Sequence, residues 1–285
     1  MGQIIRLETF HEGLHRLALL RKPANFKPPG PLILMLHGAG GTASWTLEET
    51  GWGRLADRVN ALLLLPEGTR ADLKKAPGFL KNPQVWNDGS PRSEMGQPGV
   101  NDLAYLDQLL QQVGSLGLAQ KDRFFLTGFS NGTGMAFRYA VHGKKKPAGF
   151  GPVSGLCLVD DYPHNLAIPT LFIAGSQDPL IPLDGGPIQS PWTGKTEIRS
   201  GVMETIKKWE LALGGAAETE EKSLPSAICI ERLCGKKRTP FHTIILAGLG
   251  HHWPGGKGTL NKRLAGNPSN QINACETLWA FWNIK

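Results

Sequence analysis

The sequence predicts an α/β fold in which a mostly parallel sheet is covered by helices on both faces. Short apolar runs, each as long as a buried strand, alternate with segments whose apolar residues recur every three or four positions. The 285 residues are 40% hydrophobic and 19% charged, which suits a buried core rather than a disordered chain. A chain of this length can still form one core, so we expect residues 1–285 to be a single domain.

The expected elements follow from these patterns in chain order. Each apolar run ends at Pro, Gly or a polar cluster, and each helix is expected where the spacing changes from continuous apolar residues to three- and four-residue steps. The expected strands are residues 4–7, 17–20, 32–36, 61–65, 123–127, 150–154, 170–174 and 242–247. The expected helices are residues 48–60, 101–113, 131–142, 201–213 and 271–282.

Three segments between these elements are expected to be loops. Residues 66–100 contain five Pro and little periodicity, and a long irregular stretch in an α/β domain is commonly functional, so we expect it near the site. Residues 184–199 and 254–270 are rich in Gly, Pro, Ser and Thr, which is turn chemistry.

Composition excludes several classes of protein. No run approaches the roughly 20 apolar residues needed to cross a bilayer, so we expect no membrane span. The net charge is +7, but the basic residues are scattered and no nucleic-acid motif accompanies them, so we expect no nucleic-acid partner. The four Cys include no CxxC pair and no His at finger spacing, so we expect no metal site and no cofactor. Cys229 and Cys234 either close a small disulfide loop in an oxidising compartment or remain buried thiols.

The segment Gly128-Phe129-Ser130-Asn131-Gly132 is the sharpest motif in the chain. This G-x-S-x-G follows an expected strand and precedes an expected helix. In that context it is a nucleophile elbow, a turn so tight that the residues two positions either side of the serine must be very small. We therefore predict that Ser130 is a catalytic nucleophile.

A serine hydroxyl needs a base, and the base needs an orienting group. On a fold with this elbow the acid and then the base follow the serine along the chain. Asp178 comes just after the expected strand 170–174, where open parallel sheets collect their chemistry. It is the predicted acid; the alternatives are a structural Asp that caps a turn before Pro, or another carboxylate as the acid (Asp160, Asp161 or Asp184). His251 and His252 lie in a Gly-rich loop beyond the last expected strand, and spacing alone does not choose between them.

Backbone N–H groups must also meet the oxyanion of a tetrahedral intermediate. One is predicted at Asn131, the residue after the nucleophile, and the other at Ala39 in the loop His37-Gly-Ala-Gly-Gly41. We expect His37 to fix this loop by hydrogen bonds rather than to act as a base.

Three tryptophans lie in expected loops near these residues. Trp45 follows the oxyanion loop, Trp86 lies in the long segment 66–100, and Trp253 is two residues from His251. They either line a substrate cleft or cover the edge of the core, and we take them as candidate substrate-binding residues.

With these motifs in order, the chain resembles α/β-hydrolase esterases, and more narrowly the polyhydroxybutyrate depolymerase-like group allied to feruloyl and acetyl-xylan esterases. The matching segments are residues 36–41, 86–88, 100–102, 123–132, 135–136, 175–182 and 250–255. In that group the first His of the His-x-Trp-Pro-Gly arrangement is the base, which implies His251 rather than His252.

The resemblance implies an α/β-hydrolase fold and hydrolysis of carboxylic esters through an acyl-serine intermediate. The implied substrate is a polyhydroxyalkanoate-type polyester or its oligomers; feruloyl or acetyl-xylan ester hydrolysis is the alternative, and a non-catalytic binding protein a second one. Residues 1–13 are too polar for a secretory signal. Because the group is usually exported, we expect a secreted or periplasmic protein, with a cytoplasmic one as the alternative. We also expect a monomer.

Overall fold

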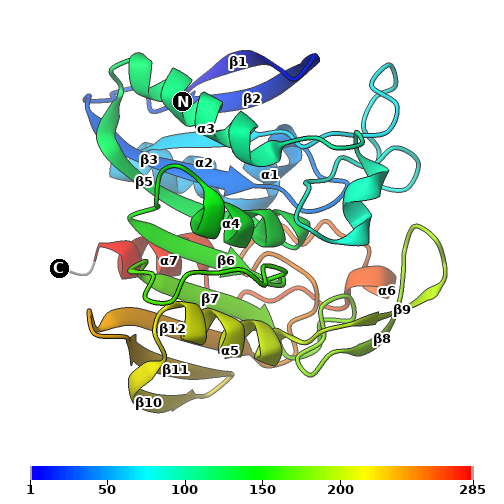
Figure 1. The fold of residues 1–285 in the computed structure, drawn as a ribbon, viewed down its shortest axis with the longest axis vertical. Helices are drawn as coiled ribbons and strands as arrows, with labels where there is room; N and C mark the ends of the chain where they lie inside the picture. The colour runs from blue at the N-terminus through cyan, green and yellow to red at the C-terminus, as the bar shows by residue number, and fades with distance from the viewer. Residues whose placement is uncertain (1, 284–285) are drawn as a thin grey trace.

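The computed structural model describes residues 2–283 and is built on a ten-stranded sheet with helices on both faces (Figure 1). Its strands run in the order β1-β2-β4-β3-β5-β6-β7-β12-β11-β10. The strands are β1 (Gln3–His11), β2 (Leu14–Lys22), β3 (Gly30–Leu36), β4 (Leu62–Pro66), β5 (Ala119–Phe129), β6 (Gly149–Val153), β7 (Thr170–Gly175), β8 (Gly186–Gln189), β9 (Thr196–Arg199), β10 (Ala216–Leu224), β11 (Ala227–Cys234) and β12 (Thr239–Leu246). The helices are α1 (Ala43–Thr50), α2 (Trp52–Val59), the 3₁₀ turn η1 (Pro91–Met95), α3 (Asp102–Ser115), α4 (Asn131–His142), α5 (Val202–Ala212), α6 (Lys262–Ala265) and α7 (Ala274–Trp282).

The centre of the sheet is parallel, which confirms the predicted class. Strands β4, β3, β5, β6, β7 and β12 pair in parallel, whereas β1–β2 and β10–β11 are antiparallel additions at the two edges. Central strands are buried on both faces, so they are continuous apolar runs such as Leu62–Pro66, every residue of which is buried. The chain passes from β3 to β4 on one side and later returns with β5 on the other side of β3. The carboxyl ends of β3 and β5 therefore meet at a topological switch point, where such sheets bind ligands.

Alternation along each strand divides the core into two layers. Leu32, Leu34 and Leu36 of β3 pack with α3, α4 and α5, whereas Ile33 and Met35 pack with α1, α2 and α7 on the opposite face. Successive side chains of a strand point to opposite faces, so one apolar run supplies both layers.

One of the five predicted helices is divided in two. Helix α3 begins as predicted after Asn101, whose side chain accepts a hydrogen bond from Ala104 N at 3.1 Å, and α4 has the predicted bounds. The predicted helix 48–60 is wrong: α1 ends at Thr50 and α2 begins at Trp52. Gly51 between them has φ +84°, a left-handed conformation that ends a helix and that glycine adopts at little cost.

Two loop predictions also need correction. Residues 184–199 contain the antiparallel pair β8–β9 rather than a simple loop, and residues 254–270 contain the short helix α6. Strands β10 and β11 have no counterpart in the prediction. Strand β10 is exposed along its whole length at the sheet edge, so it carries no apolar pattern that a sequence analysis could detect.

The disulfide between Cys229 and Cys234 is not formed, and both are buried thiols. They lie five residues apart in one extended strand, which separates them by roughly 16 Å, far beyond disulfide reach. Their side chains also enter opposite layers of the core, Cys229 with α7 and Cys234 with α5. Burial raises the pKa of the Cys234 thiol to about 11.

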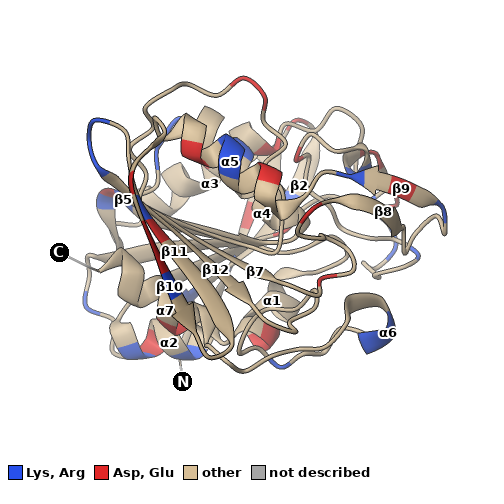
Figure 2. Ribbon diagram, turned by 90° about the horizontal axis from the view of Figure 1, so that it is seen from below, with Lys and Arg blue, Asp and Glu red and all other residues tan. Residues whose placement is uncertain are grey.

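The surface carries both signs of charge. Lys and Arg residues are spread over loops and over α5, α6 and β9, and they alternate with Asp and Glu rather than covering one face (Figure 2). Among residues 2–283, no helix is both long and apolar enough to cross a membrane.

Candidate active site

Ser130 occupies a strained turn between β5 and α4. Its backbone has φ +56° and ψ −119°. Residues with a side chain rarely adopt this conformation, whose strain is of order 1–3 kcal/mol. The turn is tight because its flanking glycines touch backbone: a Cβ on Gly128 would lie 2.4 Å from Gly132 O, and one on Gly132 would lie 2.3 Å from Leu36 O. The geometry is therefore that of the predicted nucleophile elbow.

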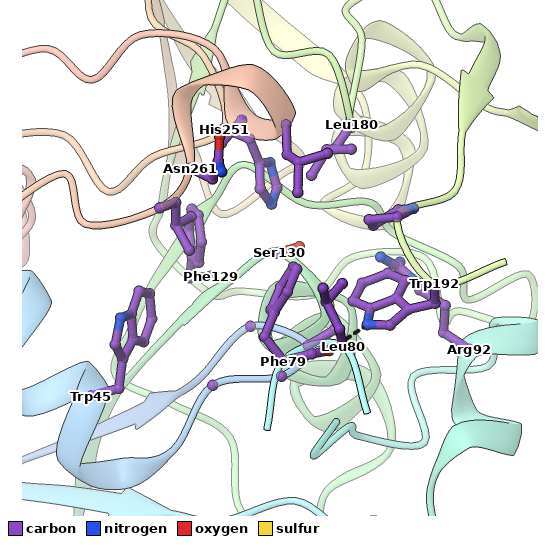
Figure 3. A pocket seen from close by; sticks show the side chains of 18 of the residues that line it. Trp45, Phe79, Leu80, Arg92, Phe129, Ser130, Leu180, Trp192, His251 and Asn261 are labelled. Carbon is purple, nitrogen blue, oxygen red and sulfur yellow. Dashed lines mark hydrogen bonds between the residues drawn. The ribbon is translucent and has the colours of Figure 1, made fainter. Parts of the chain in front are cut away.

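The elbow presents Ser130 to a pocket of about 400 Å³ at the carboxyl ends of the central strands (Figure 3). The residue is only 6% exposed, and its access to solvent is through this pocket. His251 lies on the same pocket. The serine hydroxyl and the imidazole do not hydrogen-bond to one another within the described residues 2–283, and catalytic contacts of this kind commonly tighten only when substrate binds.

Asp178 and His251 form a buried pair. Asp178 Oδ2 accepts a hydrogen bond from His251 Nδ1 at 2.7 Å, and Oδ1 accepts from the backbone N–H groups of Leu180 and Ile181 at 2.9 and 2.8 Å. The side chains are 1% and 5% exposed. Because Nδ1 is held by the carboxylate, Nε2 is the nitrogen left to face the pocket.

The competing residues are directed elsewhere. His252 is fully buried and its Nε2 donates to Gly266 O at 3.0 Å, and burial lowers the pKa of its imidazole. Asp160 and Asp161 have side chains 88% exposed and bind Lys208 and His142 at the surface. Asp184 is also exposed.

His37 fixes the loop that follows β3. Its Nδ1 donates to Gly38 O at 2.8 Å, and its Nε2 accepts from Gly68 N at 2.9 Å, so the ring is neutral and buried. Desolvation lowers its pKa to about 4. The structure thus agrees with the expectation that His37 is a loop-fixing residue and not a base.

The two backbone N–H groups predicted as oxyanion donors are unpaired within residues 2–283. Gly40 N–H donates to Gln84 O and Gly41 N–H donates to Gly38 O, whereas the N–H groups of Ala39 and Asn131 donate to no acceptor in residues 2–283. Ala39 lines the pocket beside Ser130. Asn131 is the first residue of α4, where a backbone N–H has no intrahelical acceptor.

The three candidate tryptophans have different places. Trp45 lines the pocket. Trp86 and Trp253 do not: both are fully buried, Trp86 with its indole N–H donating to His37 O at 3.0 Å, and Trp253 with its ring packed on Trp52. We therefore withdraw Trp86 and Trp253 as substrate-binding residues: Trp86 holds the loop 37–41 through His37, and Trp253 packs in the core.

Much of the pocket wall comes from the two segments that looked irregular in sequence. Phe79, Leu80 and Arg92 come from residues 66–100, which places that segment at the site as expected, and Trp192 and Arg199 come from the β8–β9 region. The Trp192 indole N–H donates to Phe79 O at 2.7 Å and joins the two segments. Sequence analysis missed these residues, because only the long irregular stretch signalled their importance.

A buried carboxylate, Glu49, fixes a third segment beside the pocket. Glu49 is 2% exposed and accepts hydrogen bonds from Gly258 N at 2.7 Å and from the Thr259 hydroxyl at 2.5 Å. Thr259 in turn accepts from the Trp45 indole at 3.1 Å. This chain of hydrogen bonds fixes the segment 257–261 next to the pocket.

Comparison with known proteins agrees with this geometry. The family model described as phospholipase/carboxylesterase, an α/β-hydrolase family, matches residues 24–195, which is more than half of the chain. The chain belongs to this family. It is an α/β hydrolase and a carboxylic ester hydrolase, which sets aside the alternative of a non-catalytic binding protein.

Similar proteins carry esterase names. This esterase is 26% identical over 267 residues to a protein named as esterase NocK from Nocardia uniformis subsp. tsuyamanensis, covering 88% of this chain and 73% of that one. It is also 26% identical over 189 residues to a protein named as feruloyl esterase C from Aspergillus niger, covering 62% of each. The match to the acetylxylan esterase/xylanase XynS20E of Neocallimastix patriciarum, 23% identical over 56% of this chain, spans only 21% of that protein.

Solved structures share the fold of this esterase. An acetyl xylan esterase from Aspergillus awamori superposes with a TM-score of 0.58 at 15% identity, covering 88% of this chain and 94% of that one. The native pOPH structure gives 0.61 at 16% identity, covering 98% and 87%.

The buried neutral His37 makes the stability of the esterase depend on pH. In the unfolded chain this histidine binds a proton as the pH falls through 6.5, whereas in the folded protein it resists protonation down to about pH 4. We therefore expect His37 to lower the unfolding free energy by about 3 kcal/mol as the pH falls from 6.5 to 4, with no such effect above pH 6.5.

Urea unfolding of the wild type and of His37→Gln between pH 4 and 7.5 measures this effect. The difference in unfolding free energy between the two proteins should shrink as the pH falls. His15→Gln, at an exposed position, is the matched control and should follow the wild-type profile. Parallel profiles for His37→Gln and the wild type would contradict the assignment.

Proposed function

We propose that this esterase cleaves its substrate through an acyl-enzyme, with Ser130 as nucleophile, His251 as base and Asp178 as the group that orients His251. The single observation that carries the proposal is that the elbow serine and His251, which is paired with the buried Asp178, line one pocket. The N–H groups of Ala39 and Asn131, which donate to nothing else in residues 2–283, are the proposed oxyanion donors.

The reaction follows from these positions. Ser130 Oγ attacks the ester carbonyl carbon while His251 Nε2 takes the hydroxyl proton. Negative charge develops on the carbonyl oxygen and is met by the two N–H groups, each worth about 3 kcal/mol of barrier height. Collapse of the intermediate breaks the bond to the alcohol, which leaves with the proton from His251. Water, activated by the same imidazole, then releases the acid and restores Ser130.

The proposed substrate is a polyhydroxyalkanoate-type polyester or its oligomers. The pocket is large enough for a short acyl chain and its alcohol, and most of its wall is apolar, with Trp45, Phe79, Leu80 and Trp192 among the lining residues. The alternative is a feruloyl or acetyl-xylan ester, which the names of the feruloyl esterase C and acetylxylan esterase relatives support.

A substrate panel separates these possibilities. Purified protein is given hydroxybutyrate oligomers, methyl ferulate and acetylated xylan, and released acid is measured at equal enzyme concentration. We expect the oligomers to give the highest kcat/KM. A higher value for methyl ferulate or for acetate release from xylan would move the esterase to the alternative class.

We further propose that residues 1–285 form a single domain, since within residues 2–283 ten of twelve strands belong to one sheet. We also propose a monomer, testable by light scattering, and a secreted or periplasmic protein, testable by locating the protein in fractionated cells of its source.

A further inference from the structure

One end of the pocket is positively charged. Arg92 and Arg199 both line the pocket that holds Ser130, and the apolar side chains of Phe79, Leu180 and Trp192 belong to the same lining. Figure 3 shows Arg92 beside Trp192, on the far side of Ser130 from Trp45. Apolar surroundings strengthen the interaction of a guanidinium with any anion that enters.

The two arginines differ in how their donors are used. Arg199 donates to Leu180 O at 3.0 Å and to Glu197 Oε2 at 3.1 Å, so its charge and geometry are held by protein groups. Arg92 donates no hydrogen bond within residues 2–283. Its nearest carboxylate oxygen is Asp88 Oδ2 at 3.7 Å, although its side chain is only 12% exposed.

Asp88 is already engaged by other donors. Its Oδ1 accepts from the backbone N–H and the hydroxyl of Ser90 at 3.0 and 2.6 Å, and its Oδ2 accepts from Asn131 Nδ2 at 2.6 Å. Asp88 therefore ties the segment that carries Arg92 to the residue next to Ser130. Arg92 is held at a fixed place relative to the serine, with the Asp88 carboxylate as its counter-charge, but its N–H groups have no hydrogen-bond acceptor in residues 2–283.

The other charged groups around Arg92 do not accept hydrogen bonds from it. Glu197 forms an ion pair with Arg199, and the positive charge of Arg199 repels that of Arg92. Burial lowers the pKa of Arg92, and the Asp88 carboxylate acts in the opposite direction. A nearly buried cation with unused donors is costly unless a ligand provides the partner.

We propose that Arg92 binds a carboxylate carried by the substrate, so that the esterase prefers anionic esters to neutral esters of the same length. This inference rests on the proposed function of Ser130. A hydroxy-acid oligomer has such a carboxylate at its free end, so the preferred polyester substrate is a short oligomer rather than the interior of a polymer. A guanidinium–carboxylate contact is a charge-assisted, bidentate hydrogen bond, so its loss should cost about 10- to 100-fold in kcat/KM.

The test uses matched pairs of esters. The acyl-side series is the mono-4-nitrophenyl esters of succinate, glutarate and adipate, each paired with the neutral 4-nitrophenyl ester of equal chain length. The leaving-group series is 3-(butyryloxy)butyrate paired with its methyl ester, and the rate in this series is the release of butyrate, measured by chromatography. The series that shows the preference identifies the side of the scissile bond on which the carboxylate lies.

The variants are Arg92→Gln and Arg92→Lys, with Arg6→Gln as control because the Arg6 side chain is 66% exposed on β1, outside the pocket lining. We expect the ratio of kcat/KM for the anionic ester to that for its neutral partner to fall at least tenfold in Arg92→Gln. Arg92→Lys should keep part of the preference, since the charge remains but the fork geometry is lost. Arg6→Gln should keep the wild-type ratio.

The outcomes separate this inference from the proposed function. If the wild type hydrolyses neutral esters and shows no preference for an anionic ester in either series, the role of Arg92 is overturned while Ser130 catalysis stands. An equal loss on both members of a pair in Arg92→Gln would also overturn it and indicate a structural role. No hydrolysis of any ester by the wild type would instead contradict the proposed function.

Discussion

Replacement of Ser130 by alanine is expected to lower kcat/KM for 4-nitrophenyl butyrate by about 10⁵- to 10⁶-fold. The variant has no atom with which to form the acyl-enzyme, so only binding and oxyanion stabilisation remain to act on attack by water. The fold should persist, because the Ser130 hydroxyl makes no hydrogen bond to the described residues and alanine occupies the same strained backbone. Initial rates measured by nitrophenolate release, with thermal unfolding as the check on folding, test this prediction.

The control variant is Ser115→Ala, at the surface end of α3, which should retain the wild-type rate. Labelling with a fluorophosphonate gives an independent readout, since the wild type should carry one adduct at Ser130 and Ser130→Ala none. Equal esterase rates in Ser130→Ala and the wild type would reject Ser130 as the nucleophile.

The parts of the site that could be predicted from sequence are those set by short-range backbone demands. The elbow requires Gly128 and Gly132 because backbone atoms approach within 2.4 Å of where a Cβ would stand, and that need is visible in five consecutive residues. Asp178 and the pair His251–His252 could be placed because each follows a strand whose apolar run marks its end, and the resemblance to the esterase group then implied His251. Parallel strands bring those ends to one edge of the sheet, so residues far apart in sequence meet there.

The pocket wall could not be predicted in the same way. Phe79 and Trp192 meet through one indole-to-carbonyl hydrogen bond between segments 113 residues apart, and neither segment has a periodicity that indicates which side chains point inward. The tryptophans show the same limit. Trp86 and Trp253 are close in sequence to functional residues, but packing buries them, whereas Trp45 reaches the pocket.

Local exceptions account for the remaining differences in the fold. Gly51 splits an otherwise continuous helical pattern because a single residue turns left-handed. The edge strand β10 pairs only with β11 through its backbone, so its polar sequence gives no signal of a strand. The pairing of β10 is therefore determined by the neighbouring strand β11 and not by the side chains of β10.

Asp178→Asn is expected to reduce kcat for short esters by about 10⁴-fold while leaving the protein folded. The reason lies in how the two carboxylate oxygens are used. Oδ1 accepts from the N–H groups of Leu180 and Ile181, so the asparagine oxygen is best placed there and its NH₂ group then faces His251 Nδ1. A donor at that position forces Nδ1 to accept and moves the imidazole proton to Nε2. The base then cannot take the proton from Ser130.

The matched control is Asp184→Asn, an exposed aspartate in the same segment, which should leave kcat at the wild-type level. Because the tautomer and not the fold is altered, Asp178→Asn should bind a neutral substrate analogue with an inhibition constant close to that of the wild type. Fluorophosphonate labelling should slow in parallel with kcat, since both reactions need the same deprotonation of Ser130. Slow turnover with labelling at the wild-type rate would show that Asp178 acts after acylation, and an unchanged kcat would assign the orienting role to another carboxylate.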